Sequence, residues 1–211
     1  EKEDIEANIK SNVETIKYLR EHNNNISGRV SEIRDEIIGY IGATTDEIPF
    51  IGELISVKDK EREWESAIER ILHNFALRLI VPEKYYRQVN DYVNNRNLRG
   101  RIVYHRYNGV ETLRNLEYRN VQDSSLLNKI EFKPDARYVD WIEDRLHAEF
   151  NYICVNTLED FNHINEKAVT KEGLIKSKGG KHEKDDRPEA NRREHYVLGW
   201  DNREKIASIR K

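Results

Sequence analysis

The sequence predicts an α/β or α+β domain that one long helix enters and a second helix leaves. Residues 1–40 carry a heptad-spaced series of apolar side chains. Residues 48–164 alternate between short apolar runs of strand length and segments whose apolar residues recur with helical spacing. A helix-start pattern follows near the C-terminus. We therefore expect an N-terminal coiled-coil arm (1–40), a globular domain (41–200) and the start of a returning arm (201–211).

The N-terminal arm is predicted from eleven positions that are spaced alternately by three and four residues, nine of them apolar or aromatic. No proline interrupts the series, so we expect a continuous helix of about 35 residues. Asn12 and Asn23 would fix register or partner number, and Gly28 would weaken the helix locally. A long amphipathic helix lying on the domain is the alternative. The positions are Ile5, Ile9, Asn12, Ile16, Leu19, Asn23, Ile26, Val30, Ile33, Ile37 and Tyr40.

The globular domain is predicted from alternating periodicities. Residues 106–129 are polar and weakly patterned, and we expect a long loop there. The returning helix is expected to start at Asp201, whose side chain can cap it, with Glu204 at the third helical position. Strands are expected at residues 48–57, 77–81, 101–105 and 152–155, and helices at 59–72, 85–93, 139–150 and 158–164.

Composition limits the classes of function. Charged residues make up 36% of the chain and apolar residues 37%, which favours an elongated, water-exposed molecule. The net charge of -3 gives no bulk attraction to nucleic acid, so any DNA contact requires a local basic patch. The single cysteine, Cys154, forms no intramolecular disulfide, and no apolar run reaches the roughly 18 residues of a membrane span. We expect a cytoplasmic protein, and the lack of methionine indicates a piece of a longer polypeptide.

Five stretches of the globular domain carry a resemblance to a known family: residues 48–55, 64–72, 98–104, 181–187 and 196–202. They resemble the hinge of SMC-like ATPases. The strongest resemblance is to the JetC family, the MukB/MksB-type ATPases of Wadjet anti-plasmid systems. A looser parallel with SMC hinges in general covers residues 168–175 and the pair Gly179–Gly180. The resemblance implies an SMC-hinge-like globular domain flanked by coiled-coil arm stubs.

The resemblance also implies partners. It implies a homodimer joined through the hinge, while ATP and magnesium would bind in head domains outside this chain, so no cofactor is expected within it. The complex would hold double-stranded DNA and include kleisin, winged-helix and nuclease subunits bound through other regions. The hinge of a MukB/MksB chromosome-organising condensin is the alternative, and an ordinary hairpin turn is the alternative for the glycine pair. The candidate dimer contacts are Gly173, Leu174, Ile175, Gly179 and Gly180.

A basic segment is the candidate DNA contact. Residues 168–193 hold eight lysines and arginines against five acids, and lysines on a glycine-containing loop suit contacts to DNA phosphates that ignore sequence. A solvated loop or a salt-bridged interface is the alternative. The candidate DNA-binding residues are Lys176, Lys178, Lys181, Lys184, Arg187, Arg192 and Arg193.

Catalytic motifs give little support to an enzyme. The phosphate-binding pattern Gly-x-x-x-x-Gly-Lys-Ser/Thr does not occur in the sequence. His182, Glu183, Asp185, Asp186 and His195 supply donors for a divalent ion, but no zinc-site spacing accompanies them, and a solvated loop is the simpler interpretation. We therefore expect no catalysis within this chain, and a metal-dependent enzyme centred on His182–Asp186 is the minor alternative.

Overall fold

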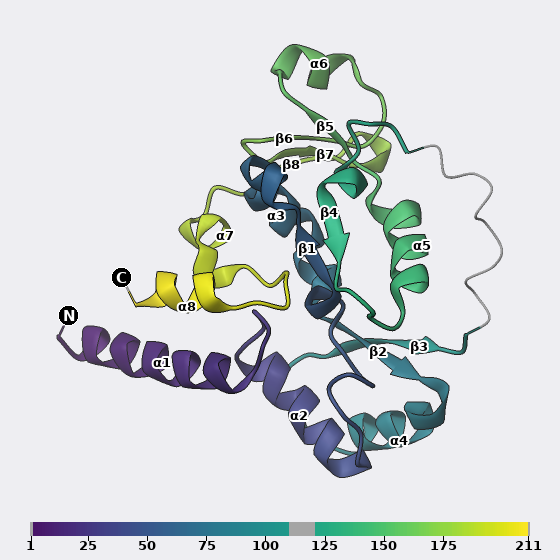
Figure 1. Cartoon of the computed structure of the whole chain (residues 1–211). Coiled ribbons are helices and arrows are strands. Elements are labelled where there is room, and N and C mark those ends of the chain that lie inside the picture. The colour runs from purple at the N-terminus through teal and green to yellow at the C-terminus, as the bar shows by residue number, and fades with distance from the viewer. Residues whose placement is uncertain (1, 110–120, 211) are drawn as a thin grey trace.

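The computed structural model describes residues 2–109 and 121–210 (Figure 1). The helices of this part of the chain are α1 (Lys2–Glu21), α2 (Arg29–Ile41), α3 (Glu65–Ala76), α4 (Glu83–Asn94), α5 (Val139–Phe150), α6 (Leu158–His163), α7 (Pro188–Asn191) and α8 (Arg203–Ile209). The strands are β1 (Ile55–Val57), β2 (Arg78–Pro82), β3 (Val103–Tyr107), β4 (Ile130–Phe132), β5 (Ile153–Val155), β6 (Ala168–Thr170), β7 (Leu174–Lys176) and β8 (His182–Lys184). This mixture of helices and small sheets confirms the predicted fold class.

The described strands form small sheets rather than one large one. β2 and β3 pair in parallel, and the helix α4 lies between them in the sequence. β1 pairs antiparallel with β4. The larger sheet has the order β5-β6-β7-β8, in which β5 and β6 are parallel and the remaining pairs are antiparallel. The β2 run Leu79–Val81 is buried at every residue, as expected for a parallel strand covered on both faces.

The core is centred on α3. Its residues Ile68, Leu72 and Phe75 recur at helical spacing and are at most 1% exposed. The ring of Phe75 lies 4.8 Å, centroid to centroid, from the ring of Phe150 on α5, so two helices far apart in sequence share this core. Burial of each such side chain contributes about 1.5–3 kcal/mol. A smaller cluster of Val155, Phe161 and Ala168 joins α6 to the larger sheet.

The predicted continuous helix over the first 40 residues is wrong. α1 ends at Glu21, the chain turns, and α2 begins at Arg29. Gly28 precedes α2 with φ 81° and ψ -163°, a conformation open almost exclusively to glycine. The second half of the heptad series then packs into the globular core through Ile33 and Ile37, both 0% exposed. The first half lies on α1, which extends away from the domain beside α8 (Figure 1).

Most other predicted elements are present, with one clear exception. The strands expected at 77–81, 101–105 and 152–155 correspond to β2, β3 and β5 within a few residues, and β4 was not predicted. The strand expected over 48–57 is limited to β1, because residues 51–54 form a 3₁₀ turn instead. That turn is fixed by the buried carboxylate of Glu53, which accepts the Phe50 N–H at 3.1 Å. Of the loop expected at 106–129, residues 110–120 lie outside the described residues, and 126–129 form another 3₁₀ turn.

Candidate dimer edge and arm junction

Strand β8 is the open edge of the larger sheet. All three of its residues are exposed, and it pairs antiparallel with β7 in a register that sets Glu183 opposite Ile175. The Ser177 N–H donates to the Lys181 carbonyl at 2.8 Å. Because backbone groups alternate in direction along an antiparallel strand, this bond orients the N–H groups of His182 and Lys184 outward. The edge therefore offers backbone donors and acceptors to which another strand can pair.

The five predicted dimer contacts fall in three environments. Gly179 and Gly180 form the turn into β8 with φ near 80°, and open space surrounds both. Gly173 has φ 80° as well, but it is buried: a Cβ there would lie 1.7 Å from the Nη1 atom of Arg70 on α3. Leu174 and Ile175 are half-buried on β7. The glycine pair thus lies beside the open edge, whereas Gly173 contacts its own domain.

Three of the predicted DNA-binding cations pair with acids two residues away. Lys181 binds Glu183 at 2.8 Å, and Lys184 binds Asp186. The Arg187 guanidinium lies 2.7 Å from Asp185 and holds the pKa of that carboxyl at about 2. Exposed pairs of this kind are weak, so a phosphate can compete for the cations. Their contact with DNA stays a prediction.

Of the other four predicted cations, two bind groups within the domain and two have no ion-pair partner among the described residues. Lys176 donates to the carbonyls of Phe161 (2.5 Å) and Ile164 (2.8 Å), so it binds the C-terminal end of α6. Arg193 binds Glu65 at 2.6 Å and also contacts Glu204. Within the described part of the chain, Lys178 and Arg192 are exposed and have no ion-pair partner. The basic segment is therefore less free to bind phosphates than its composition suggests.

The arm junction is a second candidate site, where α1 ends and α8 begins. The Asn202 amide nitrogen donates to the carbonyls of Leu19, His22 and Asn24, the last at 3.0 Å. The Lys205 ammonium, on the first turn of α8, donates to the carbonyls of Asn25 and Tyr196 (2.8 Å). Asn202 and Lys205 are 7% and 5% exposed. Side chains of the C-terminal segment thus satisfy backbone carbonyls some 180 residues earlier.

Asn25 makes the reciprocal contact. Its amide nitrogen donates to the carbonyls of Leu198 (2.7 Å) and Asp201 (3.1 Å). The neighbouring Asn24 amide donates to Glu53 at 2.5 Å, and Glu53 also pairs with the fully buried Arg34. Burial raises the pKa of Glu53, and Arg34 acts against that rise. Residues 24 and 25 are therefore tied to both the core and the outgoing segment.

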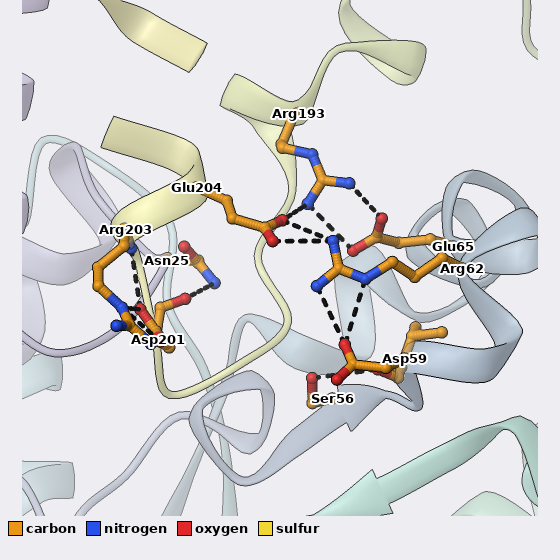
Figure 2. Close-up of polar contacts among 10 residues, drawn as sticks. Asn25, Ser56, Asp59, Arg62, Glu65, Arg193, Asp201, Arg203 and Glu204 are labelled. Carbon is orange, nitrogen blue, oxygen red and sulfur yellow. Dashed lines mark hydrogen bonds and ion pairs between the residues drawn. The ribbon is translucent and has the colours of Figure 1, made fainter. Parts of the chain in front are cut away.

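Ion pairs surround the start of α8 at the surface (Figure 2). Arg62 and Arg193 both point toward Glu204, with Arg62 Nη1 2.8 Å from Glu204 Oε1. The predicted helix cap is wrong in its detail: Asn202 holds the cap position, and Asp201 accepts from the Arg203 N–H at 3.0 Å. Glu204 is drawn toward the two arginines instead of closing a capping box. The pairs line a cleft of about 490 Å³.

Two buried titratable groups lie beneath this cleft. Glu69 on α3 accepts the N–H groups of Val197 and Leu198, each at 3.0 Å, so it holds the segment that leads to α8. Burial raises the pKa of Glu69 to about 7, against the opposing effect of those two hydrogen bonds. Burial lowers the pKa of Lys205 to about 8, opposed by the charge of Glu69. Both groups therefore titrate near neutral pH.

The described residues that were considered for catalysis or metal binding do not come together in one site. Among the residues that the structure describes, no group of three His, Cys, Asp or Glu side chains is arranged to hold a metal ion. Asp185 is engaged by Arg187, and the ring of His182 lies edge-on to Phe161. Burial raises the pKa of the Cys154 thiol to about 12, which makes it a poor nucleophile. No helix in the described ranges is both long and apolar enough to cross a membrane.

The junction residues Asn25, Asn202 and Lys205 are absent from the sequence-based candidates. The available signal was the run Asn23–Asn25 inside a predicted coiled coil, because asparagine favours caps and turns over helix interiors. Nothing in the spacing of Lys205 distinguishes it from the exposed lysines of an arm. Its role depends on contacts with residues that are remote in sequence, which a pattern of local spacing does not contain.

Comparison with known proteins identifies the fold. No family model and no curated protein sequence matches the chain. Among solved structures, the Geobacillus stearothermophilus SMC hinge domain, an asymmetric dimer, aligns with 90% of this chain and 79% of its own length, at 19% identity and a TM-score of 0.55. The chain has the fold of an SMC hinge domain. The Pyrococcus furiosus SMC hinge domain agrees, aligning with 82% of this chain and 87% of its own at 23% identity and a TM-score of 0.52.

A cohesin structure also contains this fold. The structure described as the folded elbow of cohesin aligns with 95% of this chain, at 17% identity and a TM-score of 0.57. The chain spans about 28% of the length of that cohesin chain. The likeness therefore extends over nearly all of this chain but over a minor part of the cohesin chain.

Proposed function

We propose that this domain is a hinge that joins two copies of the chain at the tip of their coiled-coil arms. The observation that carries the proposal is that α1 and α8 lie side by side as they leave a domain with the SMC hinge fold (Figure 1). An antiparallel helical arm requires this arrangement of an incoming and an outgoing helix. In this role the domain is an interaction module and not an enzyme.

The surface of α1 supports the arm. Ile5, Ile9 and Val13 follow one another at four-residue intervals and are 54%, 57% and 59% exposed. Such a stripe on an otherwise polar helix is typical of a coiled-coil seam. We infer that a longer returning helix, continuing the direction of α8, covers this stripe in the full-length protein.

We further propose that the full-length protein is an SMC-like ATPase of the Wadjet type, which resembles JetC. Its head domains would bind ATP and magnesium, and kleisin, winged-helix and nuclease subunits would bind outside the hinge, in the cytoplasm. The hinge would close a ring around double-stranded DNA. A MukB/MksB chromosome-organising condensin is the second candidate, and a nuclease subunit that co-purifies with the full-length protein would decide in favour of Wadjet.

Dimerisation is tested by light scattering on the 211-residue chain across a dilution series. If the open edge of β8 contributes, Lys184→Pro removes an outward backbone donor and lowers the dimer fraction. Lys184→Ala is the matched control, because it removes the same charged side chain but keeps the N–H group. A chain that is monomeric at every concentration, or a Pro variant that dimerises as well as the Ala variant, would contradict a dimer through this edge.

DNA contact is proposed at the basic segment, with Lys178 and Arg192 as the cations that have no ion-pair partner among the described residues. A contact to phosphates predicts affinity that falls steeply with salt and does not depend on sequence. Fluorescence anisotropy with a labelled duplex measures this. Lys178→Ala with Arg192→Ala should weaken binding, whereas Lys176→Ala tests a lysine that the fold already uses. Equal affinity of wild type and the double variant would place any DNA contact elsewhere.

A further inference from the structure

The turn between α1 and α2, residues 22–28, interrupts a pattern that the sequence continues. Ile16, Leu19, Asn23, Ile26 and Val30 keep the alternating three- and four-residue spacing without a change of phase. The segment contains no proline. A helix through residues 2–41 is therefore compatible with the sequence, although the structure has a turn there.

The carbonyls at this turn have replacement partners. In a continuous helix, the carbonyl of Leu19 would accept the N–H of Asn23, and the carbonyl of His22 would accept that of Ile26. In the structure, both carbonyls accept from the side chain of Asn202 instead. The Ile26 N–H donates to the side chain of Asn24 at 2.9 Å. The Ile26 N–H carries a single hydrogen, so its bond to the Asn24 side chain and the helical bond to the His22 carbonyl exclude one another.

A compact set of residues holds the turn in place. Asn202 has two amide hydrogens and three carbonyls within reach, and Lys205 adds the carbonyl of Asn25. Asn25 in turn binds the carbonyls of Leu198 and Asp201. Gly28 supplies the φ of 81° that the turn requires. We call Asn25, Asn202 and Lys205 the latch.

We propose that residues 22–28 are a two-state joint, bent while the latch is closed and helical when the latch releases. In the bent state α1 lies against α8. In the helical state α1 continues the axis of α2, and α1 and α8 separate. The joint would set the direction in which an arm leaves the domain. This inference goes beyond the proposed hinge role, and it holds or fails whether or not the domain dimerises.

The test measures the distance between spin labels on α1 and α8. Glu14→Cys and Ala207→Cys place labels at exposed positions of the two helices, and the native Cys154 is buried and stays unlabelled. Wild type should give one short distance. Gly28→Ala disfavours the bent state, and Asn202→Ala opens the latch. Each should raise the ratio of long to short distances roughly tenfold. The double variant should therefore show a separate long distance.

Controls distinguish the joint from general damage. Gly179→Ala places the same substitution at φ 79° in an open turn, and Asn162→Ala removes an exposed asparagine from α6; their double variant should keep the single short distance. Open space surrounds Gly28, so Gly28→Ala alone carries the test if the double variant does not fold. Amide exchange across residues 22–28 should slow when the helix forms. A folded Gly28→Ala, Asn202→Ala protein with only the short distance, or with a broad distribution and fast exchange, would overturn the proposal.

Discussion

Glu69 gives the sharpest prediction about stability, because it is a buried carboxyl whose charge changes near neutral pH. It is 4% exposed and accepts the N–H groups of Val197 and Leu198. Its pKa is raised by burial from an ordinary 4.5 to about 7. The neutral carboxyl therefore favours the folded state. That stabilisation is complete below the unfolded pKa and is lost as the pH rises through about 7.

The size of the effect follows from the two pKa values. At pH 5 the carboxyl is neutral in the folded protein, and at pH 8 it is ionised in both states. Integrating proton linkage between these limits gives a loss of roughly 2–3 kcal/mol in the free energy of unfolding. Lys205 acts in the opposite direction, because its pKa is lowered to about 8: its contribution is present at high pH and is lost as the pH falls through that value. Comparison with a variant is therefore needed to isolate Glu69.

The variant is Glu69→Gln, which keeps the shape of the side chain but does not titrate. Urea unfolding between pH 5 and 8 measures both proteins, and the buried Trp64 and Trp141 report the transition by fluorescence. At pH 5 wild type should be the more stable, since one amide oxygen replaces two carboxyl oxygens as acceptors for the Val197 and Leu198 N–H groups. This advantage should shrink by roughly 2–3 kcal/mol at pH 8. If the free energies of unfolding of the two proteins changed by the same amount between pH 5 and 8, the raised pKa of Glu69 would be refuted.

Three further substitutions test the packing. Gly52→Ala should lower the free energy of unfolding by about 1–3 kcal/mol, since its Cβ would lie 2.9 Å from the Cβ of Ala76. Gly173→Ala should cost more than Gly179→Ala in urea unfolding, because both have φ near 80° but only Gly173 lies beneath Arg70; equal losses would contradict that contact. Arg62→Ala should cost less than about 1 kcal/mol despite its ion pairs, because the side chain is 47% exposed; a larger loss by thermal unfolding would indicate a less solvated network.

The elements of the globular domain that have a local periodicity were predictable, whereas the strands β6, β7 and β8 were not predicted. The apolar run 77–81 precedes a proline and becomes the buried strand β2, and the apolar positions between residues 139 and 150 all belong to α5. The sequence predicted which residues of the basic segment are positively charged, but not which of them are exposed and able to bind a phosphate. Whether a lysine faces solvent or a helix end depends on tertiary structure, as Lys176 shows by binding the end of α6.

The turn at residues 22–28 shows why the prediction of one continuous helix over the first 40 residues failed. A heptad pattern reports which side chains are buried, and Leu19 and Ile26 are indeed 0% and 1% exposed. It does not report whether the backbone between them is helical. Here the carbonyls are satisfied by Asn202 and Lys205, which lie about 180 residues away in sequence. The spacing of apolar residues in one sequence does not report contacts with remote residues. The same spacing is therefore compatible with a continuous helix and with a turn at residues 22–28.

The length of β8 limits what the open edge can contribute to a dimer. Its outward-facing residues, His182 and Lys184, offer at most about four backbone hydrogen bonds, each worth about 0.5–1.5 kcal/mol net. That total is below the roughly 8 kcal/mol of a micromolar complex, so the edge alone cannot hold a dimer at that concentration. In a two-fold dimer Lys184→Pro removes one donor from each copy, a loss of about 1–3 kcal/mol that should weaken dimerisation roughly 5- to 150-fold relative to Lys184→Ala. Analytical ultracentrifugation measures both dissociation constants. Complete loss of dimer in the Pro variant at concentrations 1000-fold above the wild-type constant would mean that the fold itself, and not the edge pairing, had been damaged.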